Sequence, residues 1–206
     1  MNKLDIHRAI EHTNKTADFP SVYTKSGIEI KSLYPIFGLC NEFEEMREKM
    51  YKSPNSFGDE IMDEAGDVTW YLLQVMDKLK LNTARISSIY ESTLHNGLPV
   101  FNFRVHNYMC IIDEIGFMIG SVYGRLKKVL RDTDFDTKGF TAAEAYISVI
   151  EENLGKIFAA LHVFLETVYD REDEYTAVIV TCHTRNYAKL MARKEQGKIK
   201  GEGDYR

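Results

Sequence analysis

The chain has 206 residues, of which 44% are hydrophobic and 12% aromatic. This composition suits one large domain or two small repeats around a packed core, and it excludes wholesale disorder. A formal net charge of -5 at pH 7 argues against a general nucleic-acid binder, and no stretch approaches the roughly 20 apolar residues that span a bilayer. We therefore expect a soluble protein with neither a nucleic-acid partner nor a membrane partner.

The cysteines and the first residues indicate in which cellular compartment the protein functions. Cys40, Cys110 and Cys182 lie far apart and form no CxxC pattern. This spacing predicts buried thiols in a reducing cytoplasm rather than disulfides or structural zinc. The opening stretch "MNKLDIHRAIEHTNK" has no apolar signal region, which agrees with a cytoplasmic location.

Helical periodicity runs through the intervals between the four prolines. "AVIVTC" has the composition of a strand, but it lies inside a longer helix-compatible run. "HNGLPVFNF", at 95–103, interrupts the helices and is the best internal boundary. We predict an all-α antiparallel bundle, with helices at about 3–15, 33–51, 58–80, 105–130, 141–169 and 173–194.

Two acidic pairs lie on consecutive predicted helices, Glu42 with Glu45 and Glu64 with Asp67. At 100° per residue each pair lies on the flank of its helix, beside the hydrophobic face. Two helices joined by a short connection pack antiparallel, so the flanks would gather four carboxylates. Their repulsion requires a cation, and hard oxygen ligands suit Mg²⁺ or Mn²⁺. The alternative is that these are solvated acids on amphipathic helices.

Two blocks of sequence resemble the MazG-like, all-α nucleoside triphosphate pyrophosphohydrolases. The first is "LYPIFGLCNEFEEMREKM" followed by "DEAGDVTWYLLQVMDKL", and it carries the ExxE and ExxD motifs. The second is "NYAKLMARKEQGKIKGEGDYR", with the pattern NxxKLxxR. The resemblance implies that Glu42, Glu45, Glu64 and Asp67 are catalytic and bind Mg²⁺, with Mn²⁺ as a substitute. It also implies hydrolysis of a nucleoside triphosphate to the monophosphate and pyrophosphate, in nucleotide metabolism.

Basic and aromatic residues near the motifs are candidates for substrate binding. A triphosphate needs cations around its outer oxygens. Asn186, Lys189 and Arg193 share one face of the last predicted helix and could close over the phosphates. Trp70 points away from the core face of its helix, so it is either a base-stacking platform or an interface residue. The substrate-binding candidates are Lys49, Lys52, Trp70, Asn186, Lys189 and Arg193.

The second half of the chain resembles a decayed copy of the first. Residues 116–127 align with 38–49, and residues 149–161 align with the second acidic motif. The four acids are replaced there by Gly120, Tyr123, Asn153 and Lys156. We predict an internal tandem repeat, packed as one globular pseudo-dimer. Its parts are a catalytic half at 1–95, a degenerate half at 104–194 and a glycine-rich tail at 195–206.

Two other functions stay open at this point. Dimeric dUTPases share the acidic motifs and have two unequal halves, so dUTP hydrolysis is an alternative. A helical interaction module without catalysis is the alternative from a different class. The sequence also leaves open whether the chain forms a homo-oligomer.

Overall fold

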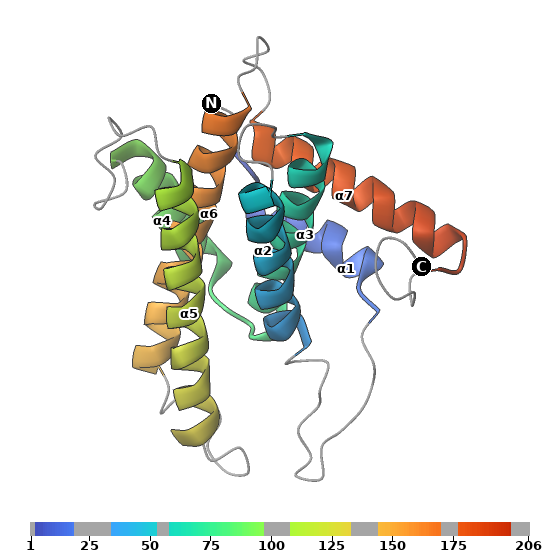
Figure 1. The fold of residues 1–206 in the computed structure, drawn as a ribbon. Helices are drawn as coiled ribbons and strands as arrows, with labels where there is room; N and C mark the ends of the chain where they lie inside the picture. The colour runs from blue at the N-terminus through green and yellow to red at the C-terminus, as the bar shows by residue number, and fades with distance from the viewer. Residues whose placement is uncertain are drawn as a thin grey trace. The chain divides into compact units, whose positions relative to one another are not determined.

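In the computed structural model the described residues are 3–18, 34–52, 58–96, 108–132, 144–169 and 177–198, and their regular structure is entirely α-helical. The prediction of an all-α fold is confirmed (Figure 1). Contacts divide the chain into two compact units, Met1–Lys80 with Asp173–Arg206, and Leu81–Glu172. The helices are α1 (Ile6–Thr16), α2 (Tyr34–Lys52), α3 (Asp59–Lys78), α4 (Thr83–Asn96), α5 (Tyr108–Asp132), α6 (Glu144–Val168) and α7 (Val178–Glu195).

Helix α4 is an addition to the predicted elements. Lys80 has a positive φ of 53°, which ends α3 and turns the chain. The side chain of Asn82 then accepts a hydrogen bond from Arg85 N at 3.1 Å, satisfying a backbone donor at the start of α4. The stretch "AVIVTC" belongs to the start of α7 and is helical after Ala177.

In the first unit α2 and α3 form an antiparallel pair. Lys49, near the end of α2, contacts Glu64 early in α3, whereas Gly38 near the start of α2 contacts Tyr71. The apolar spacing of both helices explains the pairing, because one face of each is buried throughout. The main buried side chains of this interface are Leu39, Phe43, Met46, Met50, Ile61, Ala65, Val68 and Leu72.

Helices α1 and α7 also pack on α3 and leave it with little exposed surface. The indole Nε1 of Trp70 donates to Thr16 Oγ1 at 3.0 Å, and Gln74 Nε2 donates to Thr13 Oγ1 at 2.8 Å, both on α1. On α7, His183 and Tyr187 stack with His12 of α1. Helix α3 is therefore the central helix of the unit, and it positions the acidic residues among three neighbours.

The second unit is built around α6, with α5 and α4 packed on it. Helix α5 is antiparallel to α6, because Ser121 contacts Asn153 whereas Lys128 lies over Tyr146. A Cβ on Gly155 would lie 2.7 Å from Ile89 of α4, so this glycine lets the two helices approach closely.

The boundaries of these units differ from those of the halves predicted at 1–95 and 104–194, because α4 packs on α6 and α7 packs on α3. The halves were predicted as two copies of one repeat, and this duplication stays a prediction. The cysteine prediction is wrong in part: Cys182 is buried, but Cys40 and Cys110 are exposed, and all three are free thiols. Within the described ranges, none of the helices has the length and hydrophobicity required to cross a membrane.

Candidate functional site

Three of the four predicted acids meet between α2 and α3. Glu42, Glu64 and Asp67 each offer a carboxylate oxygen, and these atoms all lie within 4.8 Å of one another. Glu64 is buried, whereas Glu42 and Asp67 are half-buried. The antiparallel pairing of the two helices explains this meeting, because it turns the acidic flank of α2 toward that of α3.

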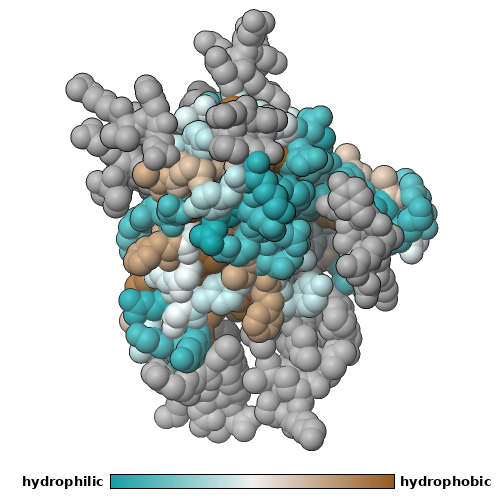
Figure 2. All heavy atoms as spheres, viewed as in Figure 1, coloured by the Kyte–Doolittle hydropathy of each residue, from teal (hydrophilic) through white to brown (hydrophobic). Residues whose placement is uncertain are grey.

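Glu45 lies outside this cluster of three carboxylates. It is exposed, and its Oε1 accepts a hydrogen bond from Asn41 Nδ2 at 2.5 Å. Glu45 is almost a full turn farther along α2 than Glu42, and its side chain leaves the buried interface. Its charge nevertheless acts on Glu64, whose pKa it helps to raise. In Figure 2 hydrophilic side chains gather over α2, where Asn41, Glu44, Glu45 and Glu48 are exposed.

Glu64 is the most unusual member of the cluster, because its side chain is only 2% exposed. Burial raises the pKa of its carboxyl above 4.5, the Lys49 ammonium opposes this, and the charges of Asp67 and Glu45 add to it. Lys49 Nζ lies 2.5 Å from Glu64 Oε1, while Oε2 is buried with no hydrogen-bond partner among the described residues. A buried carboxylate oxygen without a partner is costly, and such atoms are rare in folded proteins.

Helix α7 brings two polar side chains to Asp67. Asn186 Nδ2 donates to Asp67 Oδ1, and Lys189 Nζ lies 2.7 Å from Asp67 Oδ2. The approach depends on Gly66, since a Cβ there would lie 2.9 Å from both the Cβ of Asn186 and the carbonyl of Cys182. The glycine of the ExxD motif thus has a packing reason, and the predicted stripe on the last helix does reach the acids.

A second contact between α3 and α7 was not predicted from the sequence. Arg185 Nη1 lies 2.7 Å from Asp59 Oδ1, and its Nε lies 2.8 Å from Asp63 Oδ1. Asp59, Asp63 and Asp67 recur every four residues on α3, and Arg185 and Lys189 recur at the same interval on α7. The contact could have been predicted from this matched spacing, because residues four apart share one face of a helix.

The other predicted cations lie differently. Lys52 is on the outer surface, where its Nζ lies 2.6 Å from Glu48 Oε1 of the same helix. Arg193 is half-buried on α7, one turn beyond Lys189. Lys49 and Lys189 are therefore the predicted cations that the structure places on the carboxylate cluster.

Trp70 lies in the interior of the first unit. Its side chain is buried at 8% exposure, and its indole donates to Thr16 of α1. Trp70 lies opposite the apolar face of α3 that was identified from the sequence, and helix α1 covers this other side of α3. Trp70 is therefore a core residue of the first unit.

Tyr71 was noted only as part of the motif, yet it borders the cluster. A Cβ on Gly38 would lie 2.0 Å from Tyr71 Cε1, so the ring lies directly against α2. Burial raises the pKa of the Tyr71 hydroxyl, and the negative charges of Glu42 and Asp67 add to the effect. The phenol therefore stays protonated at neutral pH, as a hydrogen-bond donor beside the acids.

The residues present fit a small divalent cation. All three groups are carboxylates from two helices packed on each other, and hard oxygen donors suit Mg²⁺ and Mn²⁺. The unpartnered oxygen of Glu64 is the observation that favours a cation over solvated acids. In the part of the chain that the structure describes, this is the one such cluster of potential metal ligands found.

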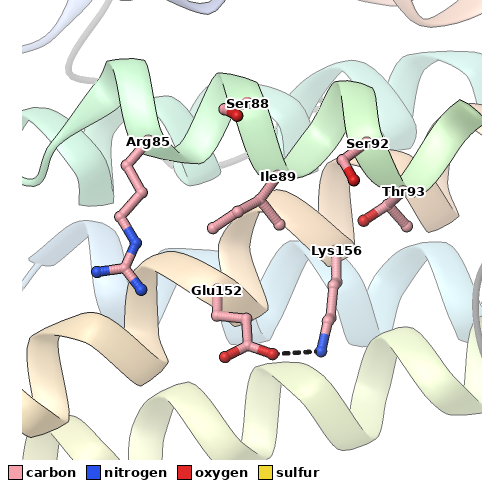
Figure 3. Close-up of a pocket in the computed structure, with 7 residues that line it drawn as sticks. All are labelled: Arg85, Ser88, Ile89, Ser92, Thr93, Glu152 and Lys156. Carbon is pink, nitrogen blue, oxygen red and sulfur yellow. Dashed lines mark hydrogen bonds and ion pairs between the residues drawn. The ribbon is translucent and has the colours of Figure 1, made fainter.

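A pocket in the second unit has a different character. It has a volume of about 390 Å³ and lies between α4 and α6, with Arg85, Glu152 and Lys156 among its lining residues (Figure 3). Lys156 Nζ lies 2.5 Å from Glu152 Oε1, and Arg85 Nη1 lies 3.4 Å from Glu151 Oε2. Each cation thus has an acid beside it, Glu152 within the lining and Glu151 outside it.

Comparison with models of known families, with curated proteins and with solved structures found no match to this chain. The resemblance to the MazG-like enzymes therefore rests on the quoted motifs, and the activity that it implies is a proposal.

Proposed function

We propose that this chain is a Mg²⁺-dependent nucleoside triphosphate pyrophosphohydrolase, which converts a (d)NTP and water to a (d)NMP and pyrophosphate. The observation that carries the proposal is the buried carboxylate of Glu64, whose unpartnered oxygen belongs to a cluster of three acids. A protein without a chemical need for this arrangement would gain stability by replacing Glu64 with a neutral residue.

Glu42, Glu64 and Asp67 are the residues that would hold magnesium. When bound, the ion would screen the phosphate charges and make a coordinated water more acidic. The carboxylates come from two helices locked together by a buried apolar interface, so little reorganisation accompanies binding. Glu45, which is exposed one turn farther along α2, would orient the attacking water and accept its proton.

Lys49 and Lys189 would bind the outer phosphate oxygens. Both ammonium groups lie on the cluster, Lys49 on α2 and Lys189 on α7, so they flank it from two sides. A triphosphate carries several negative charges, and cations on both sides would fix the chain for in-line attack. Tyr71, whose phenol is protonated at neutral pH, would supply a further hydrogen-bond donor.

The second unit would be a copy that lost its acids. Each unit contains an antiparallel helix pair, α2 with α3 and α5 with α6, and a third helix packed on the second member. In each, a glycine makes the close contact with that third helix: Gly66 touches α7, and Gly155 touches α4. These two glycines are the ones that the proposed alignment pairs. Superposition of α5 and α6 on α2 and α3 tests the duplication directly.

A screen for released phosphate tests the activity. Common nucleoside triphosphates, dUTP included, are incubated with the full chain and Mg²⁺, with and without inorganic pyrophosphatase. We expect phosphate only when pyrophosphatase is present, and none in EDTA. A response confined to dUTP would favour the dUTPase alternative. Release of phosphate without pyrophosphatase would contradict the proposal. A lack of phosphate release from every substrate, even with pyrophosphatase, would favour an interaction module without catalysis.

A further inference from the structure

The carboxylate cluster is partly neutralised by residues of the chain itself. Lys49 Nζ lies 2.5 Å from Glu64 Oε1, and Lys189 Nζ lies 2.7 Å from Asp67 Oδ2. Asn186 Nδ2 adds a hydrogen bond to Asp67 Oδ1. Three acids within 4.8 Å are thus matched by two ammonium groups and an amide. A divalent cation bound by this cluster must compete with those groups for the same oxygens.

The competition is unequal at the two carboxylates. Glu64 has one oxygen on Lys49 and a second oxygen that is buried with no hydrogen-bond partner in the described part of the chain. Asp67 has both oxygens occupied, one by Asn186 and one by Lys189. A metal ion on Asp67 would therefore lie beside the Lys189 ammonium on the same carboxylate, and the repulsion between the two cations favours the departure of the lysine.

Asn186 gives an independent sign that something else binds here. Its side chain is 3% exposed and points to Asp67, yet its Oδ1 is buried with no partner among the described residues. A buried amide with an unsatisfied acceptor is rare and costs stability. Glu64 and Asn186, which contacts Asp67, thus each leave a buried oxygen without a hydrogen-bond partner, and such oxygens can serve as ligands of a cation.

Lys189 can leave Asp67 without moving α7. Its side chain is 23% exposed and has a flexible four-carbon stem, so its ammonium can turn toward solvent. The helix stays docked because Arg185 pairs with Asp59 and Asp63, and because Gly66 packs against the backbone of Cys182. The ammonium is thus a movable counter-ion on a fixed helix.

We propose that Lys189 holds the place of the metal ion on Asp67, and that metal binding transfers its ammonium from this carboxylate to a phosphate of the substrate. The inference rests on the proposed function and adds to it that metal binding and substrate binding depend on each other. Without nucleotide, displacement costs the ion pair between Lys189 and Asp67, so metal binding is weakened. With a triphosphate present, the displaced lysine gains a partner, so metal and substrate favour each other's binding.

Titration of the full chain with Mn²⁺ alone, without nucleotide, tests the competition by calorimetry. Lys189→Met and Lys189→Gln remove the competing charge, and we expect each to lower the Kd for Mn²⁺ about tenfold or more. Lys189→Arg keeps the charge, and Lys194→Met removes an exposed charge of the same helix, so both should stay within about twofold of the wild type. Equal or weaker binding by both neutral variants would overturn the proposal.

Two further readouts separate this inference from the proposed function. Thermal melting with and without Mn²⁺ shows whether the variants fold, and the metal-induced rise in Tm should be larger for Lys189→Met than for the wild type. The same variant should lose most of its kcat/KM in spite of its tighter metal binding. If binding changes as expected but no form hydrolyses a nucleotide, the proposed function fails while the competition at Asp67 stands. If tighter binding instead raises kcat/KM, the transfer of Lys189 to phosphate is wrong.

Discussion

Lys49 Nζ on α2 lies 2.5 Å from Glu64 Oε1 on α3, which gives a nearly inaccessible carboxylate a counter-ion. Removing Lys49 leaves that charge buried without compensation. We expect Lys49→Met to lower the free energy of unfolding by about 1–2 kcal/mol, a value discounted because the lysine is one-third exposed. Urea denaturation of Lys49→Met, Glu64→Gln and the double variant measures it. Lys49→Met should cost little in the Glu64→Gln background, and an equal loss from Lys49→Met in both backgrounds would contradict the pairing.

Glu64 should make the metal-free fold less stable as the pH rises. Its pKa is raised above 4.5 in the folded state, chiefly by burial, so the folded chain binds more protons than the unfolded chain. The penalty is absent below pH 4.5 and develops as the pH rises through the raised pKa. In EDTA we expect Glu64→Gln to exceed the wild type in Tm at pH 7.5, with a smaller difference at pH 4.

Glu48 is the control for that measurement. Its pKa is lowered by the hydrogen bond from Lys52, so the sign is opposite. Glu48→Gln should therefore leave Tm unchanged or slightly reduced at neutral pH. A Glu64→Gln variant that melts below the wild type at pH 7.5 would show that the Lys49 pair outweighs burial.

Gly38 should resist any side chain. A Cβ at this position would lie 2.0 Å from Tyr71 Cε1, so the ring or the helix must shift. We expect Gly38→Ala to destabilise the protein by about 1–3 kcal/mol, although alanine favours helices. Gly124→Ala is the matched control, since nothing lies within 4 Å of its Cβ position in α5. That change should stabilise by about 0.5–1 kcal/mol in chemical denaturation. Equal effects at the two positions would contradict the close contact.

His183 should make the fold sensitive to acid. Burial, with a smaller effect of the nearby His12, lowers its pKa from 6.5 to about 4. The unfolded chain takes up the proton first, so stability falls as the pH falls from 6.5 to about 4, by at most about 3 kcal/mol. His183→Phe keeps a ring beside His12 and should flatten this decline in urea denaturation. His7→Gln, at a site 80% exposed, should keep the wild-type profile. A profile equally steep in both variants would assign the decline to other groups.

Much of the fold was readable because it depends on local spacing. The apolar period of 3.6 residues placed six of the helices to within a few residues at each end. Helix α4 was missed because its sequence, "TARISSIYESTLHN", buries only Ile86 and Tyr90 and has a weak apolar stripe. Its packing depends on Gly155 of α6, far along the chain, which local spacing cannot reveal.

The candidate site was predictable where two neighbouring helices define it, and less so elsewhere. The flanks of α2 and α3 indicated the meeting of Glu42, Glu64 and Asp67. The exposure of Glu45 depends on how the two helices are turned against each other, which is set by packing. The burial of Trp70 depends on α1, whose place on α3 has no signal in either helix alone.

The central claim, hydrolysis that needs the carboxylate cluster, is tested most directly by comparing two acids of one helix. Asp67 belongs to the cluster, whereas Asp63, one turn earlier, pairs with Arg185. Products of the best nucleoside triphosphate in Mg²⁺ are followed by ³¹P NMR for Asp67→Asn, Asp63→Asn and the wild type. We predict monophosphate and pyrophosphate from the wild type and Asp63→Asn, and a loss of at least about 100-fold in kcat for Asp67→Asn. Nucleoside diphosphate with orthophosphate as the products, or equal rates for the two variants, would contradict the account.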